Sequence, residues 1–237
     1  MICFSILFAF VFLVGNDAAL SKVGSCTSME YYCSARKCST AFFKIFQKDP
    51  KANCGAELSK LKNCVVDVMM VCMGDSLQES QVRGIVDMAF TEKQQCLDGS
   101  MEIPTMPPTG GSICSASFSS DADTCLRSFH QKFAKDKSDP ALCSENAKAK
   151  RCLKNLIDSA CNFPASTKEA LELGYSDYNP FCASNRDPGA TGNDQCDGVQ
   201  DKSGDALKYF NAAAVIKSSV LQTLMFAFFL LFLFFKV

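Results

Sequence analysis

Cysteine is the residue type in this chain whose number and spacing point to a specific chemistry, the formation of disulfide bonds. The sequence has 237 residues with 15 cysteines and a single histidine. Cys3 lies in an apolar N-terminal stretch, residues 1–19, that we interpret as a secretory signal peptide, and 14 cysteines remain for the mature chain. An even, dense set behind such a leader predicts disulfide bonds formed in an oxidising compartment.

The cysteine spacing is nearly repeated along the chain. Cys54 and Cys72 stand 18 positions apart, as do Cys143 and Cys161, and a third cysteine lies near the middle of each interval. Repeated spacing of this kind predicts one structural unit built twice. We place cysteine-rich repeat 1 at residues 20–96 and repeat 2 at residues 114–182, separated by a linker at 97–113.

The elements that position these cysteines are predicted to be helices, three in each repeat. Apolar residues from Leu58 to Cys72 recur at steps of three and four, the pattern of an amphipathic helix. Asp49-Pro50 and Gly74-Asp75 end the first and second helices, and the third helix holds residues 82–90 before Cys96. The predicted fold class is therefore all-α and disulfide-rich, with two tandem three-helix repeats.

Repeat 2 follows the same plan. Its first helix has candidate N-caps at Ser119-Ser120-Asp121, and Asp139-Pro140 supplies the turn after it. Its second helix ends near Pro164, and a short third helix begins at residues 166–167. Cys152 and Cys161 lie about 180° apart on a helix. Cys161 is therefore expected at or beyond a frayed helix end.

Helix geometry also predicts which cysteines pair. Two antiparallel helices face each other at positions equidistant from the turn that joins them, and Cys38 and Cys64 are centred on residue 51, beside the Asp49-Pro50 turn. The same rule gives a 1–5, 2–4, 3–6 order in each repeat. The remaining two cysteines, Cys33 and Cys196, have no counterparts in the repeats, and if they pair with each other the stalk is tied to repeat 1. The predicted bonds are Cys26–Cys72, Cys38–Cys64, Cys54–Cys96, Cys114–Cys161, Cys125–Cys152, Cys143–Cys182 and Cys33–Cys196.

The regions outside the repeats have distinct compositions. Residues 97–113 are rich in Pro, Gly and Thr, and their threonines are candidates for O-linked sugar. Residues 183–211 are expected to form a polar stalk. Residues 212–237 are interpreted as a removed attachment signal for a glycosylphosphatidylinositol (GPI) anchor, because small residues at Asn211-Ala212-Ala213 precede a spacer and an apolar run, 224–235. Asn211 is the predicted lipidation site. A membrane-spanning tail and a secreted protein are the alternatives.

The remaining residues argue against catalysis and against nucleic-acid binding. The 24 Lys and Arg nearly balance the 25 Asp and Glu, so no basic surface for nucleic acid is expected. The sequence contains no Cys-x-x-Cys pair of the kind that binds zinc, and no metal or cofactor is predicted. His130 is interpreted as a helix-surface residue. The acidic run 193–198 is read as solvated stalk, because a calcium loop starting at Asn193 would need Glu where Gly204 stands. A basic group on the second helix of repeat 2, read as a solvated face or a contact for an acidic partner, comprises Lys148, Lys150, Arg151 and Lys154.

The overall plan is similar to that of the glial-cell-line neurotrophic factor receptor alpha family, which is also helical, built from cysteine repeats and lipid-anchored. The adjacent Cys-Cys pairs expected in that family are absent here, and no residue motif carries over, so membership is not inferred. The expected function is that of a GPI-anchored cell-surface binding protein: a co-receptor, an adhesion molecule or a ligand-capture module. Any signalling would need a transmembrane partner.

Two other functions remain open from the sequence. One is a structural or protective coat protein without a specific ligand. The other is a carrier that holds a lipid in an apolar cavity among its helices. The side chains that could line such a cavity are Phe42, Phe43, Phe46, Met69, Met70 and Phe90.

The disulfide prediction can be tested by mapping peptides from the secreted ectodomain under non-reducing conditions. We expect one linked peptide pair to contain Cys38 and Cys64, because these residues face each other across the turn between the first and second helices. Recovery of Cys38 in a bond with any other cysteine would refute the equidistance rule.

Overall fold

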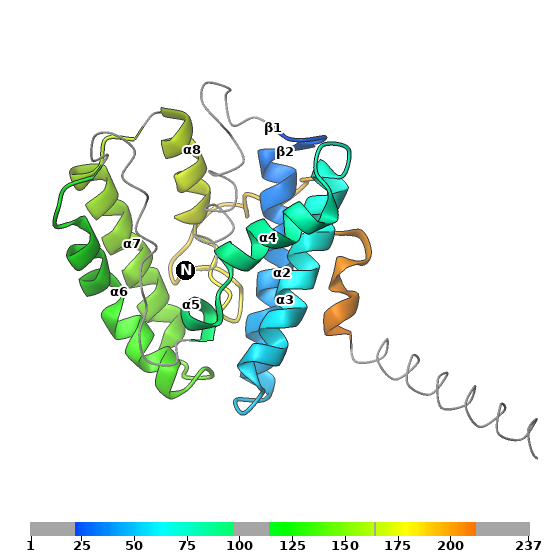
Figure 1. Cartoon of the computed structure of the whole chain (residues 1–237). Coiled ribbons are helices and arrows are strands. Elements are labelled where there is room, and N and C mark those ends of the chain that lie inside the picture. Colours follow the sequence, from blue (N-terminus) through cyan, green and yellow to red (C-terminus); the bar gives the residue numbers. More distant parts are fainter. Residues whose placement is uncertain (1–21, 97–113, 164, 212–237) are drawn as a thin grey trace, which may run out of the picture.

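The computed structural model describes residues 22–96, 114–163 and 165–211, which are mostly helical with one very short β-hairpin (Figure 1). The predicted leader, the linker and the tail after Asn211 lie outside the described residues. Among the described residues, no helix has the length and apolar character needed to cross a membrane. The elements are β1 (Lys22–Val23), β2 (Cys26–Thr27), α2 (Ser28–Lys48), α3 (Cys54–Met73), α4 (Glu79–Ala89), α5 (Glu92–Cys96), α6 (Phe118–Lys135), α7 (Leu142–Ala160), α8 (Ala165–Gly174) and the 3₁₀-helix η1 (Gly204–Phe210).

Local sequence signals set the bounds of the first two helices. α2 begins at a capping box, in which the Thr27 hydroxyl accepts a hydrogen bond from the Glu30 N–H and the Glu30 carboxylate accepts one from the Thr27 N–H. It ends before Asp49, whose backbone is extended because a proline follows. α3 ends before Gly74. Both predicted helix ends are confirmed.

A hairpin that the sequence analysis did not predict precedes α2. β1 and β2 pair antiparallel and lie against the C-terminal end of α3, where the Ser25 N–H donates to the Cys72 carbonyl at 2.8 Å. Gly24 makes this approach possible, because its φ is +61° and a Cβ there would lie 2.1 Å from the Cys72 carbonyl oxygen. The Cys26–Cys72 disulfide fixes the same contact.

The third predicted helix of repeat 1, residues 82–90, corresponds to α4, and the short helix α5 that follows it lies outside the prediction. The chain leaves helical geometry at Phe90, so residues 79–96 form α4 and the short α5 rather than one helix. Phe90 is fully buried, and the Thr91 hydroxyl accepts a hydrogen bond from the Gln94 N–H at the start of α5. The break turns the chain so that Cys96 reaches Cys54 at the start of α3.

The second unit is built on the antiparallel pair of α6 and α7 (green in Figure 1). α7 ends at Ala160 and Cys161 has extended backbone, which confirms its expected place beyond the helix end. The predicted N-caps of α6 are wrong: the helix starts at Phe118, so Ser119, Ser120 and Asp121 lie inside its first turn. Here the Ser120 hydroxyl donates to the Ser117 carbonyl instead of capping an N–H group.

Both units contain the same order of cysteine pairs. The structure bonds the six pairs that equidistance predicts, and sequence separations are 46 and 47, 26 and 27, and 42 and 39 for equivalent pairs. The seventh bond joins Cys33 to Cys196. A repeated three-helix unit is not confirmed, because repeat 1 reaches its last cysteine on α5 whereas α8 ends at Gly174, well before Cys182.

The two units share one core rather than forming separate domains. Phe43 of α2 packs on Phe133 of α6, and Phe181 inserts beside both, with ring centroids 4.5 Å from Phe43 and 5.8 Å from Phe133. Phe42 and Phe46 extend this aromatic cluster along α2. Four of the six side chains considered as a cavity lining are fully buried in this core: Phe42, Phe46, Met69 and Phe90. Packing is therefore the role that the described structure gives them.

Replacing Phe181 with alanine should weaken the whole body, because this one ring bridges α2 and α6. We expect the free energy of unfolding, measured by guanidinium denaturation with the disulfides intact, to fall by about 2–4 kcal/mol. Replacing the exposed Met88 with alanine should change it by less than about 0.5 kcal/mol. If the units were independent domains, Phe181→Ala would instead split the unfolding into two transitions and leave one of them unshifted.

Candidate functional site

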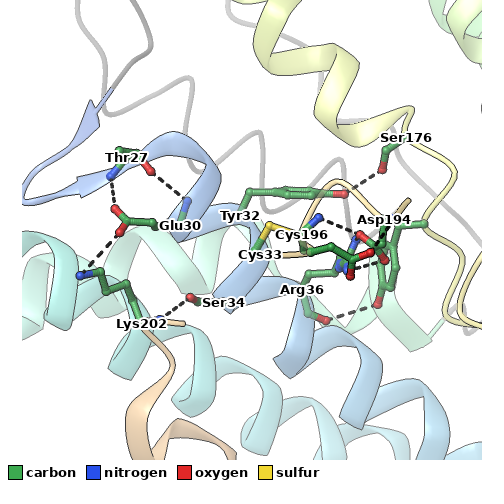
Figure 2. The surroundings of a disulfide bond; sticks show 12 residues. Thr27, Glu30, Tyr32, Cys33, Ser34, Arg36, Ser176, Asp194, Cys196 and Lys202 are labelled. Carbon is green, nitrogen blue, oxygen red and sulfur yellow. Dashed lines mark hydrogen bonds and ion pairs between the residues drawn. A yellow bond between two sulfur atoms is a disulfide. The ribbon is translucent and has the colours of Figure 1, made fainter. Parts of the chain in front are cut away.

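The most extensive polar contact region joins the N-terminal half of α2 to the segment 183–211, which we call the strap. Their composition predicts a polar stalk. In the structure they lie against α2 and α3, with η1 beside α3 (orange in Figure 1). The Cys33–Cys196 disulfide holds the strap to α2 across 163 residues of sequence (Figure 2).

One face of α2 forms the seat for the strap. Cys33, Arg36 and Thr40 follow one another at steps of three and four, so they lie along one side of the helix. The opposite side, with Ala35, Cys38, Phe42 and Phe46, faces the core. α2 is thus buried on its apolar face by the helices and partly covered on its polar face by the strap.

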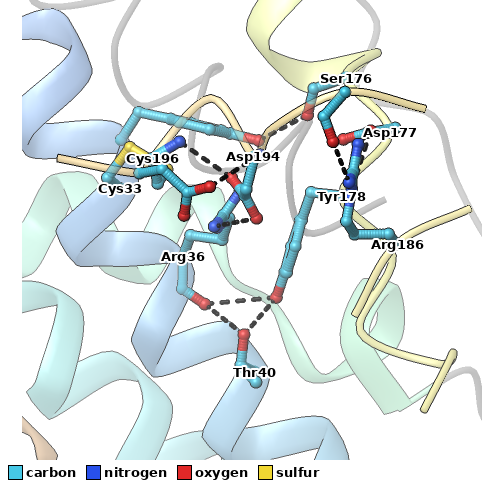
Figure 3. Close-up of polar contacts among 12 residues, drawn as sticks. Cys33, Arg36, Thr40, Ser176, Asp177, Tyr178, Arg186, Asp194 and Cys196 are labelled. Atoms are coloured by element: carbon cyan, nitrogen blue, oxygen red, sulfur yellow. Dashed lines mark hydrogen bonds and ion pairs between the residues drawn. A yellow bond between two sulfur atoms is a disulfide. The ribbon is translucent and has the colours of Figure 1, made fainter. Parts of the chain in front are cut away.

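Arg36 and Asp194 form the central ion pair of this region. Two guanidinium nitrogens donate to the two carboxylate oxygens, each at 2.8 Å, and the side chains are only 13% and 20% exposed. The guanidinium also lies 4.6 Å from the centre of the Tyr178 ring (Figure 3). This fork-to-fork geometry is the strongest form of a charged hydrogen-bonded pair.

The surroundings stabilise both charges of this pair. Burial alone would lower the pKa of Arg36, but the hydrogen bond from its guanidinium to Asp194 and nearby Tyr32 and Tyr178 raise that pKa overall. Burial alone would raise the pKa of Asp194, yet the hydrogen bond from Arg36 and one from the Cys196 N–H keep it below its ordinary value. The pair therefore stays ionised at neutral pH.

Hydroxyl groups join the same region to the loop after α8. The Tyr178 and Thr40 hydroxyls lie 2.6 Å apart, and the Tyr178 hydroxyl also donates to the Arg36 carbonyl (Figure 3). The buried Tyr32 hydroxyl is 3.0 Å from the Ser176 hydroxyl. Arg186 of the strap pairs with Asp177 of this loop, so a second ion pair joins the two segments beside the Arg36 pair.

A second row of contacts continues along α2. The Lys202 N–H donates to the Ser34 hydroxyl at 2.8 Å, and the Lys202 ammonium lies 3.6 Å from the Glu30 carboxylate (Figure 2). Lys37 pairs with Asp201. Burial raises the pKa of Asp201, but hydrogen bonds from Lys37 and Ser203 outweigh it and bring that pKa to about 2.

The predicted basic group on α7 is divided between structural roles. The Lys150 side chain is only 9% exposed; its ammonium donates to the carbonyls of Ser176 and Tyr178 and pairs with Asp187 at 2.9 Å. Its assignment to a solvated face or a partner contact is wrong, because the loop after α8 covers it. Lys148 pairs with Glu145 and Lys154 with Asp158 on the helix surface.

Two other sequence candidates also have structural neighbours. His130 is half-buried beside Phe129, and burial lowers its pKa to about 4, so it is neutral at physiological pH. The acidic run 193–198, read as solvated stalk, supplies Asp194 and Cys196 to the strap contact. Across residues 22–96, 114–163 and 165–211, no cluster of three or more His, Cys, Asp or Glu side chains is arranged to hold a metal ion.

Sequence reasoning found the disulfide of this region but missed its charges. Arg36 and Asp194 are 158 residues apart, and each lies in a polar stretch that reads as solvent-exposed. The one signal available was the pair of cysteines left over from the repeats. Comparison with known protein families, curated proteins and solved structures finds no match for this chain.

The contribution of the Arg36–Asp194 pair can be measured with a double-mutant cycle. We expect Arg36→Met and Asp194→Asn to be coupled by about 1.5–3 kcal/mol in the free energy of unfolding, because the pair is largely buried and doubly hydrogen-bonded. The exposed Arg83–Glu79 pair on α4 is the matched control, and its coupling should be about 0.3–0.5 kcal/mol.

The coupling should also depend on pH in one direction. The pKa of Asp194 is lowered in the folded state. The carboxylate therefore contributes fully to the free energy of unfolding at pH values above the ordinary pKa of a carboxyl group. It should disappear as the pH falls through the lowered pKa, when the carboxylate becomes protonated. A coupling that is unchanged once the Asp194 carboxylate has been protonated would contradict an ionic origin.

Proposed function

We propose that this chain is an extracellular binding protein, exported through the secretory pathway and held on the outer leaflet of the plasma membrane by a GPI anchor at Asn211. The proposal rests on where the strap ends. Asn211 is exposed and directly follows η1, which packs on α3. A lipid at this position would hold a folded body and not a loose chain.

The disulfides support the extracellular assignment. Seven bonds in a body with one shared core require an oxidising compartment to form, and they are typical of proteins that work outside the cell. The mostly polar outer surfaces of α4, α6 and α7 remain available for contacts with a partner.

A binding role is favoured because the body is rigid. Disulfides join α2 to α3, α6 to α7 and the strap to α2, and the ion pairs Arg36–Asp194 and Lys37–Asp201 join the strap to α2 as well. A surface that is already ordered loses little conformational entropy when it binds, which leaves more of the contact energy for affinity. The proposed partner is an extracellular protein ligand or a transmembrane co-receptor.

The anchor can be tested on cells that express the full-length chain with an epitope tag after Ala19. Phosphatidylinositol-specific phospholipase C should release the tag into the medium, and the chain should incorporate labelled ethanolamine. Replacing Asn211, Ala212 and Ala213 together with lysine should abolish both results, because the attachment site requires small residues. Replacing the same three with serine is the matched control and should preserve both.

The other outcomes overturn the proposal in different ways. Surface protein that resists the lipase and incorporates no ethanolamine would establish a membrane-spanning tail. Tag that appears in the medium without lipase would establish a secreted protein. The released ectodomain then serves as bait, and saturable binding to particular cells would support the binding role.

A further inference from the structure

Lysines that lack an ion-pair partner gather at one end of the body. Most of the lysines described elsewhere are paired with Asp or Glu, as Lys62 is with Asp87. By contrast, six lysines in the last two turns of α2 and α6 and in the connections that follow these helices form no ion pair with any described residue. They are Lys44, Lys48, Lys51, Lys132, Lys135 and Lys137. The near-balance of charge over the whole chain therefore conceals a local excess of lysine.

The two groups of lysines lie at the same end of the body. Connections 49–53 and 136–141 are both at the lower end in Figure 1. Segment 179–182 joins them, because the Gln47 side-chain amide donates to the Pro180 carbonyl at 3.3 Å and Cys182 is bonded to Cys143 at the start of α7. The ends of α2 and α6 thus form one surface, which we call the basic end and define by the six lysines.

The acidic residues at the basic end are held close to the backbone or are already paired. Each aspartate of the two connections accepts a hydrogen bond from the backbone N–H two residues later, and these residues are Asp49, Asp136 and Asp139. On the helices that follow, Glu57 and Glu145 pair with lysines of their own helices, and Glu92 of α5 lies beside Gly55. The lysines outnumber the carboxylates left without such a pair, and their longer side chains carry the ammonium groups further into solvent.

The residue types of the basic end favour a polyanion over a folded protein as its partner. Protein interfaces are rich in Tyr, Trp, Met and Arg and poor in Lys. Residues 44–53 and 132–141 contain six lysines and no Tyr, Trp, Met or Arg. A lysine ammonium is a flexible point charge, which suits a series of separate anionic groups better than one planar carboxylate. A linear polyanion also gains affinity by releasing the counterions that surround it.

We propose that the basic end binds a sulfated polysaccharide of the cell surface or extracellular matrix, with the polysaccharide chain lying across both connections. This inference names a partner class for the proposed binding role and rests on the proposed extracellular location, but not on the lipid anchor. The ammonium groups of the two lysine groups contact sulfates at successive positions along the same polymer. Two separate clusters engage one chain, so affinity requires a polymer long enough to reach both.

Immobilised heparin is the probe, and the protein is the chain purified from expressing cells after its own processing. We expect saturable binding whose Kd rises linearly with salt on a log–log plot between about 50 and 200 mM. Replacing Lys48 and Lys51 with glutamine should raise the Kd about 25-fold, at about fivefold for each lysine removed from an anionic surface. Replacing Lys132 and Lys135 with glutamine should have a similar effect, and both changes should reduce the salt dependence.

The matched control removes the same charge from paired lysines elsewhere. Lys62→Gln combined with Lys154→Gln should change the Kd by less than about twofold, because these residues pair with Asp87 and Asp158 away from the basic end. All variants should keep the melting temperature within about 2 °C, since the substituted side chains are on the surface.

Three results would overturn the proposal: no heparin binding at about 150 mM salt, equal weakening by the control variant, or equal binding of desulfated heparin or polyglutamate. The lipase experiment on the anchor is read separately. A chain that binds heparin but is not released by the lipase refutes the anchor alone, and a released chain that does not bind heparin refutes the basic end alone.

Discussion

The position of each cysteine relative to a helical turn is the constraint on which the structure depends. A disulfide needs Cα atoms within about 7 Å, and two antiparallel helices meet this requirement only at positions equally distant from their connection. Cys38 and Cys64 meet it across the Asp49-Pro50 turn, with Cα atoms 5.8 Å apart. Cys125 and Cys152 meet it across the second turn at 5.5 Å. These bonds set the register of each helix pair, and the burial of the phenylalanines follows from that register.

This constraint explains which parts of the fold could be read from the sequence. The ends of α2 and α3 depend on Pro50 and Gly74, whose effects are local, and the disulfide pairing depends on the distance along a helix. The break at Phe90 depends on burial of a ring among other elements, and the hairpin at Gly24 depends on the approach of α3. Neither of these two features has a signal within a short window of sequence.

The site shows the same division. The tie between Cys33 and Cys196 could be predicted by elimination, whereas the Arg36–Asp194 pair could not, because charges on a helix face usually point into solvent. The burial of Lys150 could not be predicted from the sequence for the same reason. Its burial depends on the carbonyls of Ser176 and Tyr178, which the chain brings over α7 only after α8. Long-range polar contacts of this kind require the tertiary structure to be known.

The long span between Cys33 and Cys196 has a consequence for how the chain is made. Synthesis proceeds at about 5–20 residues per second, so Cys196, 163 residues after Cys33, is made roughly 8–30 s later. During that interval Cys38 can already find Cys64, while Cys33 has to stay reduced or form a temporary bond with another thiol. Among the seven bonds of the described residues, Cys33–Cys196 is thus the last whose two cysteines are both available.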